Sequence, residues 1–152
     1  MNRTSIVGLV LFALLASATH GQDKQVPAQS QERIVRCHEP GVRLEGTLVK
    51  RVFYGPPGFG ETPERDARDE VFVLQLAHPV QVMAPPNPTK DETCAEERSH
   101  VSQVQVWAFQ EHRKEIRENA GKTVAITGTL DEDPGPGAHV GVQITPVSIE
   151  AK

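Results

Sequence analysis

The chain has 152 residues, which is enough for one domain of ordinary size and too few for two well-packed ones. Charged residues make up 24% of the chain and hydrophobic residues 38%, with 12 glycines, 12 prolines and 2 cysteines. This composition excludes a collagen-like repeat, a disulfide-dense miniprotein and a highly charged disordered chain. The net charge is −4, so the chain as a whole gives no electrostatic support to nucleic-acid binding.

The N-terminal sequence predicts an export signal followed by a linker. Arg3 supplies a positive charge, and residues 6–16 are almost wholly apolar but too short to cross a bilayer as a helix. Residues 16–18 (Ala-Ser-Ala) then fit the small-x-small pattern of a signal-peptide cleavage site. A retained N-terminal membrane helix is the alternative. We therefore expect a signal peptide at 1–18, a flexible polar leader at 19–36, and a mature periplasmic or secreted protein without a membrane anchor.

Two strands are predicted in the first half of the remaining chain. Apolar and polar residues alternate from Val42, which is the period of a half-buried strand, and this strand is expected to run to about Tyr54. It ends at Gly-Pro-Pro-Gly, because two prolines cannot donate to a ladder. After a long acidic loop, the run EVFVLQLA at 70–77 predicts a second strand, and residues 79–83 are compatible with its continuation after a break at His78-Pro79.

The second half is predicted to contain a strand, a helix and two further strands. Valines recur in the first of these segments, and Lys114 and Glu118 have the i,i+4 spacing that supports a helix. Gly121 is a suitable residue for the C-terminal cap of that helix. The expected elements are a strand at 101–107, a helix at 108–120, a strand at 122–130, a turn at 131–138 and a strand at 139–149.

Three strands, one helix and two strands, in the order βββαββ, is the element order of an OB-fold, a five-stranded Greek-key barrel. The helix falls between the third and fourth strands, where that fold places it at the bottom of the barrel. Gly46 and Gly128 are expected where long strands bend around the barrel. We therefore predict one mainly β, OB-fold-like barrel domain with one helix at 37–152. A less specific α+β sandwich is the alternative.

Several motifs carry a resemblance to a known family. They are Gly46-x-Leu48, the run YGPPGFGE at 54–61, Gly121-Lys122-x-Val124 and Gly128-x-Leu130. On these motifs, residues 42–149 resemble a family of small exported bacterial proteins that is defined only as a domain of unknown function. Related sequences tend to carry several histidines in the last hairpin, whereas this chain has only His139 there. The resemblance implies a fold and an export route, and it brings no catalytic residues with it.

The chain has two cysteines, Cys37 and Cys94, and in an exported protein such a pair favours one disulfide. In the predicted order, Cys37 precedes the first strand and Cys94 lies between the second and third, whose ends converge if the first two strands are antiparallel. A metal or redox site at Cys37-His38-Glu39 competes with this interpretation, but it lacks a second ligand cluster at a recognised spacing. We therefore expect a structural Cys37–Cys94 disulfide and no metal.

His139 is the best candidate for a cation ligand. It follows Asp131, Glu132 and Asp133, and carboxylate oxygens and an imidazole could converge at one hairpin. Acidic residues in a Pro-Gly turn are nevertheless usually plain surface. The sequence contains no nucleophile elbow and no phosphate-binding glycine loop, and no carboxylate pair stands out. We therefore expect a protein that is not an enzyme, with no catalytic residues and no cofactor.

The remaining candidate site is a binding surface. OB-folds usually bind ligands on the face of strands two and three, framed by the 1–2 and 4–5 loops. Here the 1–2 loop presents Tyr54 and Phe59 on a proline-stiffened support, and Glu61 and Asp66 add charge suited to a protein surface. Alternatively, both rings fold back over the barrel mouth. The candidate binding residues are Tyr54, Phe59, Glu61, Asp66 and His139.

This surface predicts a non-catalytic exported module that binds a protein partner or a small ligand. An inhibitor or immunity protein is one concrete form, because an acidic loop suits the basic cleft of a secreted enzyme. Oligonucleotides are disfavoured by the acidic loops and by export. Two alternatives stay open, namely an envelope-stress or ligand- or metal-carrier protein and a hydrolase of unknown type.

Overall fold

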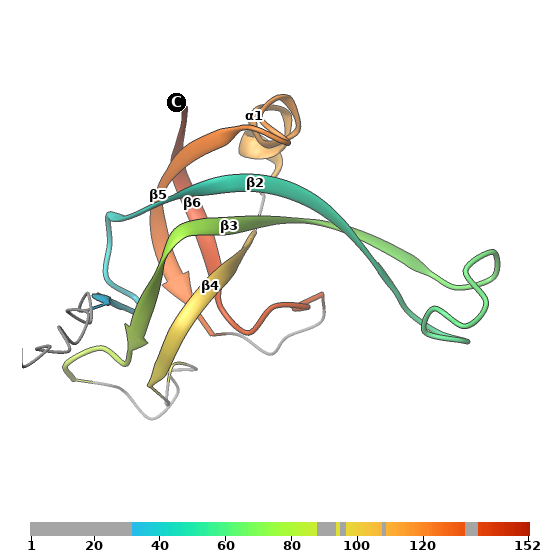
Figure 1. Cartoon of the computed structure of the whole chain (residues 1–152), viewed down its shortest axis with the longest axis horizontal. Helices are drawn as coiled ribbons and strands as arrows, with labels where there is room; N and C mark the ends of the chain where they lie inside the picture. The colour runs from blue at the N-terminus through green and yellow to red at the C-terminus, as the bar shows by residue number, and fades with distance from the viewer. Residues whose placement is uncertain (1–31, 88–93, 95–96, 108, 133–136) are drawn as a thin grey trace, which may run out of the picture. The chain divides into compact units, whose positions relative to one another are not determined.

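Figure 1 shows the computed structural model of the chain, which separates into two units, 1–30 and 31–152. Every residue described here belongs to the second unit. The described residues are 32–87, 94, 97–107, 109–132 and 137–152. The predicted signal peptide at 1–18 and residues 19–31 of the predicted leader lie outside them.

Strands dominate the described part of the chain. They are β1 (Arg33–Arg36), β2 (Val42–Tyr54), β3 (Arg68–Met83), β4 (Arg98–Val106), β5 (Thr123–Asp131) and β6 (Gln143–Ala151). Between β4 and β5 lie one turn of 3-10 helix, η1 (Gln110–His112), and a short α-helix, α1 (Arg113–Glu118). The prediction of a mainly β domain with one helix is confirmed.

All six of these strands belong to one mixed sheet, in the order β1-β3-β2-β5-β6-β4, and β3 also pairs with β4. The β1–β3 and β4–β6 pairs are parallel, and the other pairs are antiparallel. Because β3 pairs with both β2 and β4, the strands from β2 to β6 form a partly closed ring (Figure 1), and β1 is added beside β3.

The observed order differs from the predicted βββαββ, because the short strand β1 precedes it and the described residues form six strands instead of five. β1 lies within 19–36, which the sequence predicts to be a flexible leader. It pairs in parallel with the last part of β3, and Val35 is buried in the core. Two consecutive apolar residues, Ile34 and Val35, are too short a signal to predict a strand whose partner lies far along the chain.

Two other elements differ in length from the prediction. β3 runs on through Pro79, although a break was expected at His78-Pro79. Its pairing with β4 shifts register between Gln75 and Val80, and at such an irregularity a proline interrupts no regular ladder. The helix is shorter than predicted, with only η1 and α1 ordered as helical turns within 109–120.

Alternate residues of β2, beginning with Val42, point into the core, as the sequence period predicts. Gly46 lies in this series where the strands approach closely, because an added Cβ would lie 2.0 Å from the carbonyl oxygen of Gln75 on β3. Gly128 on β5 is in the same situation, since a Cβ there would lie 2.1 Å from the carbonyl oxygen of Thr145. Both positions therefore require glycine.

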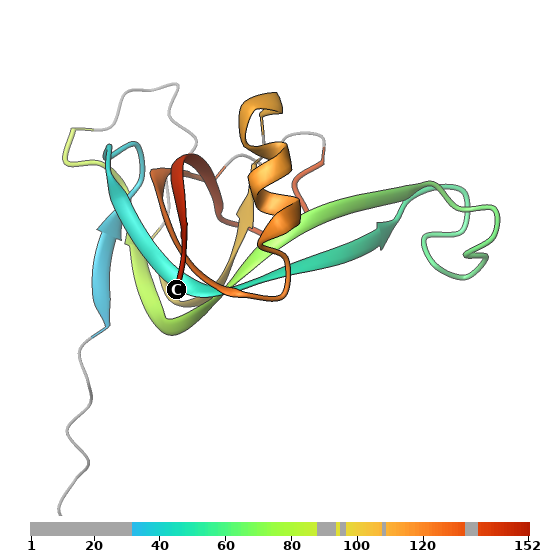
Figure 2. The ribbon, with the colours of Figure 1, turned by 90° about the horizontal axis from the view of Figure 1, so that it is seen from above.

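The β2–β3 hairpin extends beyond the rest of the sheet. β5 pairs with β2 only as far as Thr47, and β4 pairs with β3 only from Phe72 onward. The segments 51–54 and 68–71, here called the hairpin arm, therefore pair only with each other among the described residues. Figures 1 and 2 show this arm leading away from the sheet, with residues 55–67, here called the tip loop, at its end.

Candidate functional site

The tip loop is built around the side chain of Asp66, which is only 7% exposed. The backbone N–H groups of Gly58 and Gly60 each donate to its carboxylate, with N···O distances of 2.7 Å. The backbone N–H of Thr62 donates to the same carboxylate at 3.3 Å, and the Thr62 hydroxyl donates at 2.9 Å. One buried carboxylate therefore satisfies four donors and holds the loop in a single shape.

The pKa of Asp66 follows from this environment. Burial alone raises the pKa of a carboxyl group, but the hydrogen bonds from Gly60, Gly58 and Thr62 outweigh burial and lower the pKa of Asp66 below its ordinary value. The sequence places Asp66 among the residues that contact a partner. In the structure its carboxylate is bound inside the loop, so its visible role is to shape the tip.

The two predicted aromatic residues of the site are both accessible. Phe59 is 72% exposed, and Tyr54, at the end of β2, is 36% exposed beside the guanidinium of Arg68. Glu61 is exposed on the same loop. The alternative in which both rings fold over the barrel mouth does not describe Phe59. Tyr54, Phe59 and Glu61 thus reach solvent at the tip, and their contact with a partner stays a prediction.

Phe59 is held in an unusual backbone conformation. Its φ is 50°, in the left-handed region that residues with side chains rarely adopt, and Gly60 follows with φ 102°. The backbone N–H of Phe59 donates to the carbonyl oxygen of Gly55 at 3.0 Å. Because the ring lies in solvent, burial of the side chain does not compensate for this conformation. The loop holds the backbone that carries an exposed aromatic ring in a strained conformation, at some cost to stability.

His139 joins the hairpin arm instead of the acidic residues near it in the sequence. Its ring stacks on Phe53 of β2, with ring centroids 4.3 Å apart and planes 5° from parallel. Its Nε2 lies 2.7 Å from Oδ2 of Asp69 on β3. His139 therefore connects the β5–β6 loop to the hairpin arm.

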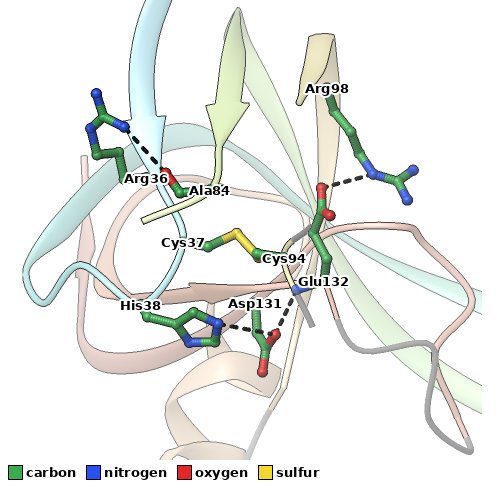
Figure 3. Close-up of a disulfide and its surroundings, with 8 residues drawn as sticks. All are labelled: Arg36, Cys37, His38, Ala84, Cys94, Arg98, Asp131 and Glu132. Atoms are coloured by element: carbon green, nitrogen blue, oxygen red, sulfur yellow. Dashed lines mark hydrogen bonds and ion pairs between the residues drawn. A yellow bond between two sulfur atoms is a disulfide. The ribbon is translucent and has the colours of Figure 1, made fainter. Parts of the chain in front are cut away.

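The acidic residues considered as partners of His139 in a cation site have other neighbours. Asp131 lies 4.0 Å from Nε2 of His38, and Glu132 lies 2.8 Å from Nε of Arg98. Asp133 lies outside the described residues. Figure 3 shows Asp131 and Glu132 pointing to these separate partners beside the disulfide. Asp131 and Glu132 therefore do not form a cation site with His139.

The Cys37–Cys94 disulfide predicted from the sequence is present, and both cysteines are buried (Figure 3). In the part of the chain that the structure describes, the potential ligand atoms that come within 4.8 Å of one another are those of His38, Cys94 and Asp131. The sulfur of Cys94 is in the disulfide and cannot act as a thiolate ligand. One histidine and one carboxylate remain, fewer than the three or four protein ligands of a typical zinc site.

Sequence reasoning missed the side chain that organises the β5–β6 loop, Gln105 of β4. This side chain is 2% exposed. Its Nε2 donates to the carbonyl oxygen of Gly137 at 2.8 Å, and its Oε1 accepts from the backbone N–H of His139 at 2.9 Å. The signal in the sequence is a polar residue between the apolar Val104 and Val106, since a buried amide needs partners of its own.

Comparison with protein-family models, curated proteins and solved structures gives no significant match. Within the described ranges, no helix is both long and apolar enough to cross a membrane. The function must therefore be inferred from the geometry of the chain itself.

Proposed function

We propose that this protein is a non-catalytic, exported binding module that recognises an exported protein partner or a small ligand through the tip loop. The observation that carries the proposal is the exposed ring of Phe59 on a backbone that the hydrogen bonds of its own loop hold in place. An aromatic side chain has few rotatable bonds, and on a preorganised backbone it loses little conformational entropy on binding. Buried aromatic anchors of this kind supply much of the energy of protein interfaces.

We propose a five-stranded OB-type barrel as the scaffold of this module. The strands β2 to β6 form a partly closed ring in the order β2-β3-β4-β6-β5, and α1 lies between β4 and β5 in the chain. This arrangement supports the barrel, with β1 as an addition at its side. In an OB barrel the β2–β3 and β5–β6 loops frame the usual binding face, so the tip loop and His139 belong to one surface.

An inhibitor or immunity-type role against a secreted enzyme is the concrete form of this proposal. Glu61 and Glu64 are exposed on the tip loop, and the loop stands clear of the sheet on the hairpin arm. A protruding loop with acidic side chains suits a concave site lined with basic groups, and complementary charge raises the association rate.

Export is part of the same proposal. It is supported by the signal peptide predicted at 1–18 and by the buried Cys37–Cys94 disulfide, because disulfides persist mainly in oxidising compartments. The resemblance to a family of small exported bacterial proteins points in the same direction and stays a prediction.

The test is an affinity capture from envelope and culture extracts with residues 19–152 as bait. The natural bait is compared with a Tyr54→Ala/Phe59→Ala variant and with Phe109→Ala, which removes an aromatic ring that is also exposed but lies away from the tip. A partner retained by the natural and Phe109→Ala baits and lost from the tip variant supports the proposal. Equal recovery by all three baits contradicts the assignment to the tip.

The electrostatic part of the proposal has a separate test. Glu61→Lys/Glu64→Lys should slow association with the captured partner several-fold, and added salt should slow association of the natural protein in the same way. Asp66 is left unchanged, because its substitution would disturb the loop itself. If neither added salt nor charge reversal changes the association rate, the electrostatic part of the proposal is wrong and only the aromatic contact remains.

A further inference from the structure

A pocket of about 310 Å³ lies at the base of the hairpin arm. It is lined by the start of β3, the end of β4 and the helix α1, which stands beside the base of the arm in Figure 2. Its apolar lining consists of Val71, Phe72, Val106 and Trp107. Pockets that bind small molecules commonly combine such an apolar lining with a few well-placed polar groups, and this volume is at the small end of their range.

The β5–β6 loop covers one side of this pocket. A Cβ added to Gly137 would lie 3.5 Å from Cη2 of Trp107, so the Gly137 backbone packs beside the indole ring. Gln105 holds Gly137 in this place through the 2.8 Å hydrogen bond to its carbonyl oxygen. The part of the pocket wall that Gly137 forms beside Trp107 is therefore held in place by a buried side chain.

The charged groups of the pocket are not equally available. Asp69 pairs with His139 at 2.7 Å, and Glu70 pairs with Lys50 at 3.1 Å. Arg113 and Arg117 also line the pocket, and within the described ranges neither guanidinium has an ion pair or a hydrogen bond. The available charge in the pocket is therefore positive.

Arg113 and Arg117 are four residues apart in α1, so they share one face of the helix. Like charges at this spacing destabilise a helix slightly. Guanidinium groups match a carboxylate with two parallel hydrogen bonds. The two guanidinium groups can bind the acid group of a ligand, and the neighbouring indole and phenyl rings can contact its apolar body.

We infer that this pocket binds a small organic carboxylate, with its acid group on Arg113 and Arg117 and its apolar body against Trp107 and Phe72. Either a free organic acid or the C-terminal carboxylate of a peptide that ends in an apolar residue supplies this chemistry. The site uses no residue of the tip loop. It therefore goes beyond the proposed function, and each can fail without the other.

The protein carries its own reporter for this site, because Trp107 is the single tryptophan of the chain. We would titrate residues 19–152 with 4-phenylbutyrate as the free acid and with N-acetyl-leucyl-phenylalanine as the peptide carboxylate. The readouts are tryptophan fluorescence and the indole N–H signal in a ¹H–¹⁵N spectrum. The matched controls are 4-phenylbutyramide and N-acetyl-leucyl-phenylalanine amide, which keep the apolar body and remove the charge.

Saturable binding of one or both acids, with at least tenfold weaker binding of their amides, supports the inference. Binding of the free acid alone identifies a metabolite-type ligand, and tighter binding of the dipeptide acid identifies a peptide C-terminus. Arg113→Gln and Arg117→Gln should each weaken binding by about tenfold or more, because each removes a charged hydrogen-bond donor. Lys114→Gln, on the exposed face of the same helix, should leave the affinity unchanged.

Three results would overturn the inference. They are the absence of saturation by either acid at 10 mM (roughly the weakest range worth assigning to a site), equal binding of acids and amides, and equal affinity in the natural protein and both arginine variants. The ¹H–¹⁵N spectrum of each variant shows whether it is folded. If Arg113→Gln were unfolded, Arg117→Gln and Lys114→Gln would still decide between a charged pocket and a purely apolar one.

Discussion

The tip loop and the β5–β6 loop are each held by one buried polar side chain, but the two side chains come from different places. Asp66 belongs to the loop that it holds, and its partners lie four to eight residues away. Gln105 belongs to β4, and the groups that it holds, Gly137 and His139, lie 32 and 34 residues further along the chain.

The difference means that the two loops depend on the sheet to different extents. The tip loop carries its own source of order at the end of the hairpin arm, whose two segments pair only with each other among the described residues. The contacts of Gln105 with Gly137 and His139 form only when β4 lies beside β6. Loss of packing in the sheet should therefore release the β5–β6 loop before it releases the tip.

Removal of the disulfide is the strongest way to test this difference. The disulfide joins residues 57 positions apart, and loss of a cross-link over such a loop should lower the free energy of unfolding by about 4 kcal/mol. We expect Cys37→Ala/Cys94→Ala to reduce amide-exchange protection at His139 more than at Gly60. Chemical denaturation and hydrogen exchange measure the two effects.

The natural protein treated with a reductant is the control for the two substitutions, since it removes the same cross-link without changing a side chain. It should unfold at nearly the same denaturant concentration as the double variant. If protection at Gly60 fell as steeply as at His139, the tip would depend on the sheet as much as the β5–β6 loop does, and the distinction would be lost.

Gln105→Leu tests the β5–β6 loop alone. Leucine fills a similar volume but leaves the carbonyl oxygen of Gly137 and the N–H of His139 without the partners seen here. Leaving buried polar groups unsatisfied should cost about 2 kcal/mol of stability, with faster amide exchange at His139 and no change at the tip. Gln103→Leu, two residues earlier on β4 and only partly buried, is the matched control and should cost less.

Asp66→Asn tests the tip alone. The asparagine amide would direct an NH₂ group at donors that now meet a carboxylate oxygen, so amide exchange at Gly58 and Gly60 should rise at least tenfold. The sheet should keep its protection. Glu64→Gln changes an exposed carboxyl group in the same loop and should have no effect. Uniform loss of protection across the sheet would mean that the tip and the sheet unfold as one unit.

The pH dependence of the tip follows from the same carboxylate. The pKa of Asp66 is lowered in the folded protein, so ionisation of Asp66 stabilises the loop fully above the ordinary pKa of an aspartate. This contribution is lost as the pH falls through the lower, folded pKa. Exchange at Gly58 and Gly60, corrected for intrinsic rates, should increase in that acidic window, and the Asp66→Asn variant should show no such step.

The regular part of this architecture was predictable because it depends on local patterns. The alternation from Val42, the turn signal at 55–58 and the recurrent valines of β4 each lie within one segment. The pairing of Cys37 with Cys94 was predictable because the chain offers one pair. The place of Tyr54 and Phe59 beside two prolines identified the tip, but whether their rings would be exposed or folded back over the barrel mouth stayed open.

The remaining features arise from pairings that no single segment reveals. β1 forms because the far end of β3 offers it a parallel partner. Asp66 is a charged residue in a polar loop and would be expected to be exposed. It becomes buried only because the loop closes around it. The contacts of His139 with Phe53 and Asp69 join segments that are more than sixty residues apart, and the acidic residues beside it in sequence suggested other partners.

The smallest expected effect concerns the ion pair between Lys50 and Glu70 at the base of the arm. The two groups lie 3.1 Å apart, but both side chains are about half exposed, so solvent screens their attraction. A double-mutant cycle with Lys50→Gln and Glu70→Gln should give a coupling energy below about 1 kcal/mol that decreases with salt. The arm would then owe its order to backbone pairing and to the stacking of His139 on Phe53. A larger coupling, insensitive to salt, would instead show that this ion pair, like the buried side chains of Asp66 and Gln105, contributes to local order. Side-chain contacts would then hold the arm as well as backbone pairing.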